Sequence, residues 1–292
     1  MPQNSFHDLW WSAEDAKRLY ARNYPSKGGF ARLSVMCLHG LTRNSADFEE
    51  VAPYLSAMGH RVIVPDMRGR GRSEYDENPI NYNIFTYAKD IIRLIDHLGI
   101  GRLHFIGTSM GGLITMIIHS LRPDLFSGVV FNDVGPYLSS EGLSRIAKLG
   151  GGGAKGFADW QAAAAYAKAS NGLAFPHYND NDWLAMAKRL CIEKHRGHIV
   201  LNYDPNIMKA FEQPAPDTPI SFDMSAYFIP MAVCDQLMLI RGALSDIVGH
   251  DEASQMQALA PDMVRLDLDG IGHAPMLSEP DAKSAIEGFF KT

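Results

Sequence analysis

The chain has 292 residues, a net charge of −6 and a hydrophobic fraction of 46%, so it can fill a sizeable core in one large domain or two ordinary ones. Both charge signs are well represented, and no apolar run approaches the roughly 20 residues that cross a bilayer, which argues against nucleic-acid and membrane partners. The start of the chain lacks the basic and apolar regions of a secretion signal. The three cysteines, Cys37, Cys191 and Cys234, are scattered without a C-x-x-C pair and indicate reduced thiols. We therefore expect a cytoplasmic monomer or homodimer that acts on a small molecule.

The first half of the chain alternates strands and helices after an initial hairpin. Residues 1–30 interleave aromatic and polar residues around the turn-like segment 12–15, which predicts two paired strands. Apolar runs typical of buried parallel strands lie at residues 33–38, 61–66, 103–107 and 129–133. Helical patterns lie at residues 44–58, 88–98 and 110–121, with Gly99 and Pro123 as the stops of the last two. This alternation predicts an α/β fold with a doubly wound, mostly parallel sheet.

The alternation breaks between Gly135 and Met231. A glycine run at 150–153 is followed by two helical segments, 157–170 and 182–195, without strands between them. Strands at 237–242 and 264–269 and helices at 251–259 and 281–290 then resume the pattern. We therefore predict a core formed by residues 1–136 and 230–292, with a helical cap of residues 137–229 inserted after the sixth strand.

The sharpest chemical signal is Gly107-Thr108-Ser109-Met110-Gly111, which ends one predicted strand and opens a predicted helix. A turn this tight leaves no room for β-carbons two residues on either side of Ser109, so glycine is needed at both positions. We interpret Ser109 as a nucleophile. The alternative is a serine that only caps the helix.

A serine hydroxyl is a poor nucleophile until a base takes its proton, and an acid must orient that base. His273 follows the last predicted strand, and Asp246 follows the strand 237–242. Because the carboxyl ends of parallel strands form one edge of a sheet, we predict that Ser109, His273 and Asp246 converge there. Asp133 is the alternative acid, but the Val-Gly-Pro after it favours the start of the cap.

Two backbone N–H groups are candidates for an oxyanion hole. Leu41 follows His39-Gly40 at the end of the strand 33–38 and can direct an N–H toward a developing negative charge. Met110 lies at the first turn of the helix after Ser109, where the helix dipole favours an anion. We predict that these two N–H groups act together.

The other conspicuous residues are interpreted as structural. His195 and His198 have helical spacing, but no carboxylate or thiol lies beside them in the sequence, so we predict no metal and no cofactor. The basic stretch 68–72 lacks the phosphate-binding pattern of a P-loop and is interpreted as a structural loop. The cap carries many aromatic and methionine residues, of which we expect a minority to face a substrate and the rest to form its core. They are Trp160, Tyr166, Phe175, Trp183, Met186, Tyr203, Met208, Phe211, Met224, Tyr227 and Phe228.

Taken together, these residues resemble the α/β-hydrolase family. The resemblance rests on His39-Gly40, the D-x-R-G-x-G-x-S stretch at 66–73, the G-x-S-x-G motif around Ser109, and the later Asp246 and His273. It covers the chain outside the cap and is strongest to cap-bearing esterases and carbon–carbon hydrolases, whose cap follows the strand that here ends at Asp133. In that family the histidine before the glycine has a structural or orienting part, which we expect of His39.

The resemblance implies hydrolysis of a small apolar or aromatic carboxylic ester through an acyl-enzyme. Family members that cleave carbon–carbon bonds of ring-fission products usually carry H-G-x-G-P-G and an asparagine before the serine, whereas this chain has residues 39–44 as HGLTRN and Thr108. Dehalogenases and epoxide hydrolases of this fold use aspartate in place of Ser109. Hydrolysis of a diketone is the alternative reaction, and a slow-turnover ligand receptor is the alternative class of function. The mixed charges of the cap offer no clamp for a polyanionic substrate.

Overall fold

The computed structural model describes residues 5–28, 32–149, 156–194, 197–211, 222–233 and 236–291. The glycine run at 150–153, His195 and Cys234 lie outside these residues. Cys37 and Cys191 are buried free thiols. In the part of the chain that is described, no helix has both the length and the apolar composition to span a membrane.

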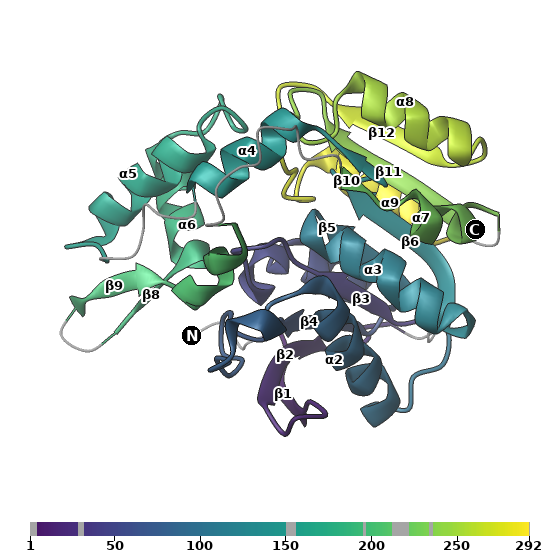
Figure 1. Cartoon of the computed structure of the whole chain (residues 1–292), viewed down its shortest axis with the longest axis horizontal. Helices are drawn as coiled ribbons and strands as arrows, with labels where there is room; N and C mark the ends of the chain where they lie inside the picture. The colour runs from purple at the N-terminus through teal and green to yellow at the C-terminus, as the bar shows by residue number, and fades with distance from the viewer. Residues whose placement is uncertain are drawn as a thin grey trace.

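One sheet forms the centre of the molecule (Figure 1). Its described strands follow the order β1-β2-β4-β3-β5-β6-β11-β12. They are β1 (His7–Ser12), β2 (Arg18–Tyr24), β3 (Val35–Leu38), β4 (Val62–Asp66), β5 (Leu103–Thr108), β6 (Phe126–Asn132), β11 (Gln236–Gly242) and β12 (Val264–Leu268). The β1–β2 and β2–β4 pairs are antiparallel, and the remaining neighbours are parallel. The predicted N-terminal hairpin and the mostly parallel sheet are confirmed.

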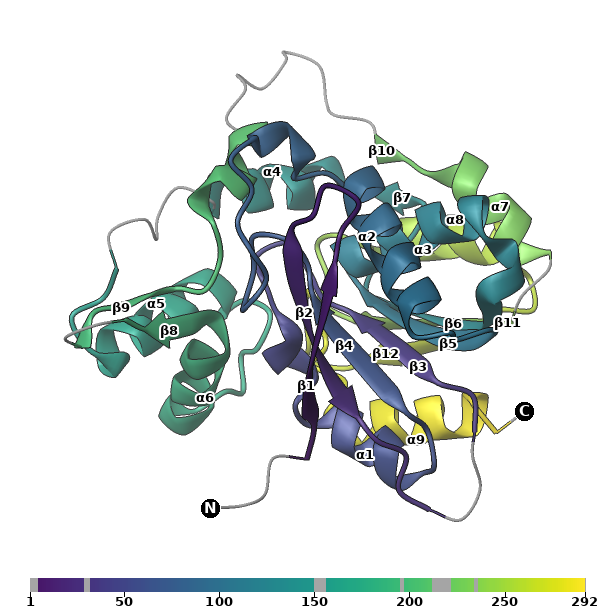
Figure 2. The ribbon, with the colours of Figure 1, turned by 90° about the horizontal axis from the view of Figure 1, so that it is seen from below.

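Helices cover both faces of this sheet (Figure 2). One face carries α2 (Ile84–His97), α3 (Met110–Leu121), α7 (Ser225–Ala232) and α8 (His250–Leu259), and the other carries α1 (Val51–Ala57) and α9 (Pro280–Phe289). The connections include the short 3-10 helices η1 (Ser45–Phe48), η2 (Pro79–Asn81), η3 (Pro123–Leu125) and η5 (Pro205–Phe211). The predicted helix–sheet alternation is confirmed, and the helix expected at 44–58 is divided into η1 and α1.

Local sequence explains where the two central helices begin and end. Asn83 caps α2 by accepting hydrogen bonds from the first-turn N–H groups, and the chain leaves the helix at Gly99, whose φ of 60° suits glycine. The α3 helix is buried from Met110 to His119, which accounts for its apolar residues on most faces. It ends just before Pro123, as predicted.

The cap lies between β6 and β11. It contains α4 (Ser140–Leu149), α5 (Trp160–Asn171), α6 (Asp180–Leu190) and a hairpin of β8 (Cys191–Glu193) with β9 (Ile199–Leu201). A separate hydrophobic cluster stabilises it, with Trp183 and Met186 among its buried members. At its base, β7 (Tyr137–Leu138) pairs with β10 (Phe222–Asp223). The insertion after the sixth strand is confirmed.

Two details of the cap differ from the sequence prediction. The helix expected over 182–195 ends at Leu190, because Cys191 is extended (φ −118°, ψ 160°) and its strand pairs with β9. The predicted boundary at 229/230 divides α7, but this helix packs on the core, where the ring of Phe228 lies 5.8 Å from that of Phe131. The first difference comes from pairing with another strand, and the second from packing against residues distant in the sequence. Helical periodicity contains neither kind of information.

Candidate active site

Ser109 lies on a strained turn between β5 and α3, with φ 51° and ψ −118°. A β-carbon at Gly107 would lie 2.6 Å from the Cα of Gly112, and one at Gly111 would lie 2.1 Å from the carbonyl oxygen of Leu38. Neither position can hold a side chain unless the backbone moves. The steric reason predicted for the two glycines is confirmed, and the turn presents Ser109 to a cavity.

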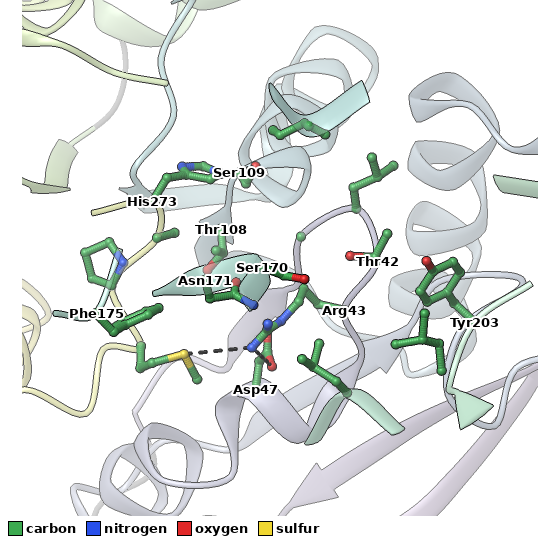
Figure 3. Close-up of a pocket in the computed structure, with 18 of the residues that line it drawn as sticks. Thr42, Arg43, Asp47, Thr108, Ser109, Ser170, Asn171, Phe175, Tyr203 and His273 are labelled. Atoms are coloured by element: carbon green, nitrogen blue, oxygen red, sulfur yellow. Dashed lines mark hydrogen bonds and ion pairs between the residues drawn. The ribbon is translucent and has the colours of Figure 1, made fainter. Parts of the chain in front are cut away.

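His273 joins Ser109 to a carboxylate. Its Nε2 lies 2.9 Å from Ser109 Oγ, and its Nδ1 lies 2.7 Å from Asp133 Oδ2. Ser109 and His273 adjoin at one side of the cavity in Figure 3. With Nδ1 donating to the carboxylate, Nε2 is left to accept the serine proton, which is the arrangement that activates a hydroxyl.

Asp133 is completely buried at the end of β6 and is held by three donors. Besides His273, Ser245 Oγ donates to Oδ2 at 2.6 Å, and the N–H of Gly242 donates to Oδ1 at 3.0 Å. Ser245 Oγ in turn accepts from the N–H groups of Ile247 and Val248. These bonds compensate the burial of the carboxylate and fix the direction in which it meets His273.

The predicted contact between Asp246 and His273 is wrong. Asp246 instead accepts hydrogen bonds from Arg145 of α4, through Nε and through Nη2 at 2.8 Å. Partial burial is the largest single influence and would raise the pKa of Asp246, but the hydrogen bonds and the positive charge of Arg145, with smaller contributions, together hold that pKa below its usual value. After β11 it is Ser245 that turns inward, and its hydroxyl contacts Asp133.

Asn132 is a supporting residue that the sequence analysis missed. Its Nδ2 donates to Thr108 Oγ1 at 3.0 Å and to the carbonyl oxygen of Pro275 at 2.8 Å. It therefore ties the turn before Ser109 to the loop that carries His273. The signal available in the sequence was a buried polar residue next to Asp133, at the end of a strand.

Leu41 and Met110 lie where the oxyanion prediction places them in the chain. Leu41 lines the cavity together with Ser109, and Met110 is the first residue of α3, so its N–H has no acceptor within the helix. Met110 itself is buried. One N–H group thus belongs to a loop that lines the cavity and the other to the residue after Ser109. That the two bind an oxyanion together stays a prediction.

Buried groups fix the loop that carries Leu41. Arg70 is fully buried, and its Nε donates to the carbonyl oxygen of Leu41 at 2.9 Å. His39 Nε2 accepts from the N–H of Met67 at 3.0 Å, and its Nδ1 lies 2.8 Å from the carbonyl oxygen of Gly40. Burial lowers the pKa of His39 to about 4, so the ring is neutral near pH 7. The expected orienting part of His39 agrees with these contacts.

The basic stretch 68–72 is a structural loop, as predicted. Arg68 is buried and forms ion pairs with Asp15, Asp76 and Asp90. Arg70 bonds to the Leu41 loop. The third arginine, Arg72, forms an ion pair with Asp8 at the surface. The two buried guanidinium groups are engaged inside the protein and cannot hold a phosphate.

The cavity beside Ser109 has about 160 Å³ open to water and is lined by both core and cap (Figure 3). Of the aromatic and methionine residues named from the cap sequence, Tyr166, Phe175, Tyr203 and Met208 line it. Trp183 and Met186 belong instead to the cap cluster, and Met224 and Phe228 to the main core. A minority of these residues thus lines the cavity, and their contact with a substrate stays a prediction. The Phe211 side chain lies outside the described part.

The cap contacts the loop of His273 directly. The N–H of Gly272 donates to the carbonyl oxygen of Ala174 at 2.7 Å, and a β-carbon at Gly272 would lie 2.7 Å from the Cα of Ala174. This close approach needs glycine. It brings Phe175, the next cap residue, to the cavity wall.

Charged side chains also line the cavity, which the sequence analysis did not foresee. Arg43 donates to Asp47 through Nε at 2.7 Å and Nη2 at 2.8 Å, and Arg145 reaches the cavity from α4. Within the described residues, no group of three or more His, Cys, Asp or Glu side chains is placed to hold a metal ion.

Comparison with known proteins agrees with the fold. Residues 34–280 match the sequence model of the alpha/beta hydrolase fold family. A 3-hydroxybutyrate-oligomer hydrolase of Cupriavidus necator is 28% identical over 259 residues, which cover 88% of this chain and 87% of that protein. A 2-(acetamidomethylene)succinate hydrolase of Mesorhizobium japonicum is 34% identical over 132 residues, 45% of this chain and 46% of that protein. The crystal structure of an alpha/beta hydrolase from Novosphingobium aromaticivorans superposes with a TM-score of 0.89 at 38% identity and 98% coverage of both chains.

Proposed function

This chain belongs to the α/β-hydrolase fold family, and we propose that it hydrolyses a small carboxylic ester through Ser109, His273 and Asp133. The observation that carries the proposal is the hydrogen-bonded series from Ser109 Oγ through His273 to Asp133 Oδ2, at the wall of a cavity. A series of this kind is what acyl transfer to a serine requires.

The reaction follows from the direction of each hydrogen bond. Ser109 Oγ attacks the ester carbonyl carbon while His273 Nε2 takes the hydroxyl proton, and Asp133 stabilises the imidazolium that results. The N–H groups of Leu41 and Met110 bind the oxyanion of the tetrahedral intermediate. Its collapse breaks the bond to the alcohol oxygen, which leaves with the proton from His273. Water, activated by the same histidine, then attacks the acyl-enzyme and releases the acid.

Three observations favour an ester as the substrate. Serine stands where epoxide hydrolases and dehalogenases of this fold use aspartate, so Ser109 supports acyl transfer. One relative that aligns over most of this chain is named as a hydrolase of 3-hydroxybutyrate oligomers, which are linear esters. The cavity is small, and Phe175, Leu190 and Leu201 among its lining residues suit a short apolar acyl group.

Two measurements test this proposal. The first is a panel of p-nitrophenyl esters of increasing acyl length, run beside a vinylogous ring-fission diketone. We expect short to medium acyl esters to be cleaved best. Turnover of the diketone with inert esters would replace ester hydrolysis by carbon–carbon hydrolysis at the same residues, and a kcat far below about 1 s⁻¹ on every substrate would favour a ligand receptor.

The second measurement identifies the nucleophile. An organophosphate should label the peptide that contains Ser109 and abolish esterase activity, because it reacts with an activated serine. Ser254 is a matched control: it is an exposed residue of α8, and its Oγ donates to the carbonyl oxygen of His250. A label on another peptide, or esterase activity that survives labelling of Ser109, would contradict the proposal.

A further inference from the structure

The charges that line the cavity do not cancel. Among the described lining residues, the carboxylate of Asp47 faces Arg43, and the two side chains form a close ion pair with 16% and 12% of their surfaces exposed. Because both partners lie on the cavity wall, an incoming anion meets the Asp47 charge as well as the Arg43 charge. This pair offers little net attraction to a negative group.

Arg145 differs because its partner stands outside the cavity lining. Arg145 of α4 lines the cavity, whereas Asp246 is not among the lining residues. Asp246 engages Nε and Nη2, and among the described residues no acceptor is bonded to Nη1. About a third of the Arg145 side chain is exposed. Toward the cavity, Arg145 is therefore a positive charge with unused donors.

The backbone holds Arg145 in a fixed place. A β-carbon at Gly142, one helical turn earlier, would lie 2.3 Å from the carbonyl oxygen of Asp246, so α4 touches the loop after β11 without a side chain between them. The N–H of Ser139 also donates to the carbonyl oxygen of Ile247 at 3.0 Å. The same loop carries Ser245, which contacts Asp133. Arg145 is thus positioned relative to the hydrogen-bonded series of Ser109, His273 and Asp133.

We propose that Arg145 binds a carboxylate of the substrate through Nη1, so that the enzyme prefers esters that also carry a carboxylic acid. The inference rests on the proposed ester hydrolysis and names its substrate class. Asp246 holds the guanidinium through Nε and Nη2, so Nη1 is the nitrogen that a substrate carboxylate would meet. A charge-assisted hydrogen bond in a partly dehydrated cavity is strong enough to select between charged and neutral substrates. One arginine suits one carboxylate, which agrees with the expectation that no polyanion is bound.

The test compares acids with their neutral amides. One pair is the mono-p-nitrophenyl ester of adipate and its monoamide, which places the charge on the acyl side. The other pair is the butanoyl ester of 4-hydroxybenzoate and that of 4-hydroxybenzamide, which places it on the alcohol side. We expect the wild-type kcat/KM to favour the acid in one pair. Arg145→Gln should lower that preference about tenfold, mainly through KM, and Arg145→Lys should restore part of it.

The neutral amides separate the two proposals. If Ser109-dependent cleavage of the amides is normal but Arg145→Gln leaves the acid-to-amide ratio unchanged, or the wild type shows no preference in either pair, the carboxylate inference is overturned and ester hydrolysis stands. If the wild type cleaves none of the four esters, ester hydrolysis itself fails. Asp246→Asn should keep or raise the preference for the acid, because it removes a competing negative charge. A preference lost in Asp246→Asn but kept in Arg145→Gln would also overturn the inference.

Discussion

Asp133 and Asp246 follow two neighbouring parallel strands, β6 and β11, at the same edge of the sheet. Their surroundings differ. Asp133 is completely buried and accepts hydrogen bonds from His273, Ser245 and Gly242. Asp246 keeps 36% of its side chain exposed and is bonded to Arg145 of the cap. A carboxylate at the correct sheet edge therefore becomes the partner of the histidine only when the chain turns it inward.

The turn after each strand makes this difference. Asp133 has a positive φ of 54°, and its N–H donates to the carbonyl oxygen of Ile240 in β11, so the side chain is held in the layer of the sheet. After β11 the inward position is taken by Ser245, one residue before Asp246. The loop after β11 therefore supports Asp133 through Ser245, and its own aspartate, Asp246, contacts the cap.

Ser109→Ala should have the largest effect, and its residual kcat is the reference for the variants of both aspartates. Removing the attacking oxygen should lower kcat by about 10⁴-fold or more. The fold should be retained, because the hydrogen bond of Oγ is to His273 alone among the described contacts. Measurement of kcat on a p-nitrophenyl ester, with a thermal melt of each protein, checks both parts. A loss smaller than tenfold in a folded variant would contradict the nucleophile.

Asp133→Asn should come next, with kcat lower by about 10³- to 10⁴-fold. The amide can donate to His273 Nδ1, which favours the tautomer whose Nε2 carries the proton and cannot accept one from Ser109. The pH dependence of kcat and a melting curve should be measured together, because the buried amide also loses a charge that three donors surround. An activity near that of the wild type would remove Asp133 from the reaction.

Ser245→Ala sharpens the comparison at the residue that joins the two loops. We expect kcat to fall by about tenfold, because Asp133 loses one donor yet keeps His273 and Gly242. Unfolding in urea should show a loss of about 1–3 kcal/mol, because the N–H groups of Ile247 and Val248 lose their acceptor. Ser254→Ala, at an exposed serine, is the matched control and should change neither quantity.

Asp246→Asn should have the smallest effect, with kcat on a neutral ester within about threefold of the wild type. The contribution of the pair to stability should be below about 1 kcal/mol, because both side chains are partly exposed. The pKa of Asp246 is lowered in the folded protein, so this contribution is present above the unfolded pKa and disappears as pH falls through the folded value. Unfolding free energies of both proteins from neutral pH to about pH 3 should therefore converge in acid.

The sequence predicted those parts of the site that local sterics determine. Glycine at 107 and 111 follows from the turn at Ser109, and His273 follows from its place after the last strand. The choice between Asp133 and Asp246 depends on which loop turns inward, and that is set by contacts across neighbouring strands. Arg145 reaches the cavity because Gly142 allows α4 to touch the loop after β11. No pattern in the local sequence predicts that these two backbone segments come so close together.

The same distinction between local and long-range determinants applies to the fold. Hydrophobic periodicity and helix-ending residues predicted the strands and helices of the core. Each of these elements buries either one face or one continuous apolar run, which the sequence shows. The cap hairpin of β8 and β9 was missed because its strands are short and are held by pairing with each other. The core position of α7 was missed as well, since it rests on packing against α3 and β6 rather than on the sequence of α7.

The imidazole proton of His273 tests the central claim most directly. A proton on Nδ1 that is hydrogen-bonded to a carboxylate gives a low-field resonance in the NMR spectrum of protein with ¹⁵N-labelled histidine. We predict that this resonance is present in the wild type and in Asp246→Asn, and that it moves or disappears in Asp133→Asn. A resonance that is lost in Asp246→Asn and unchanged in Asp133→Asn would contradict the assignment of Asp133 as the partner of His273.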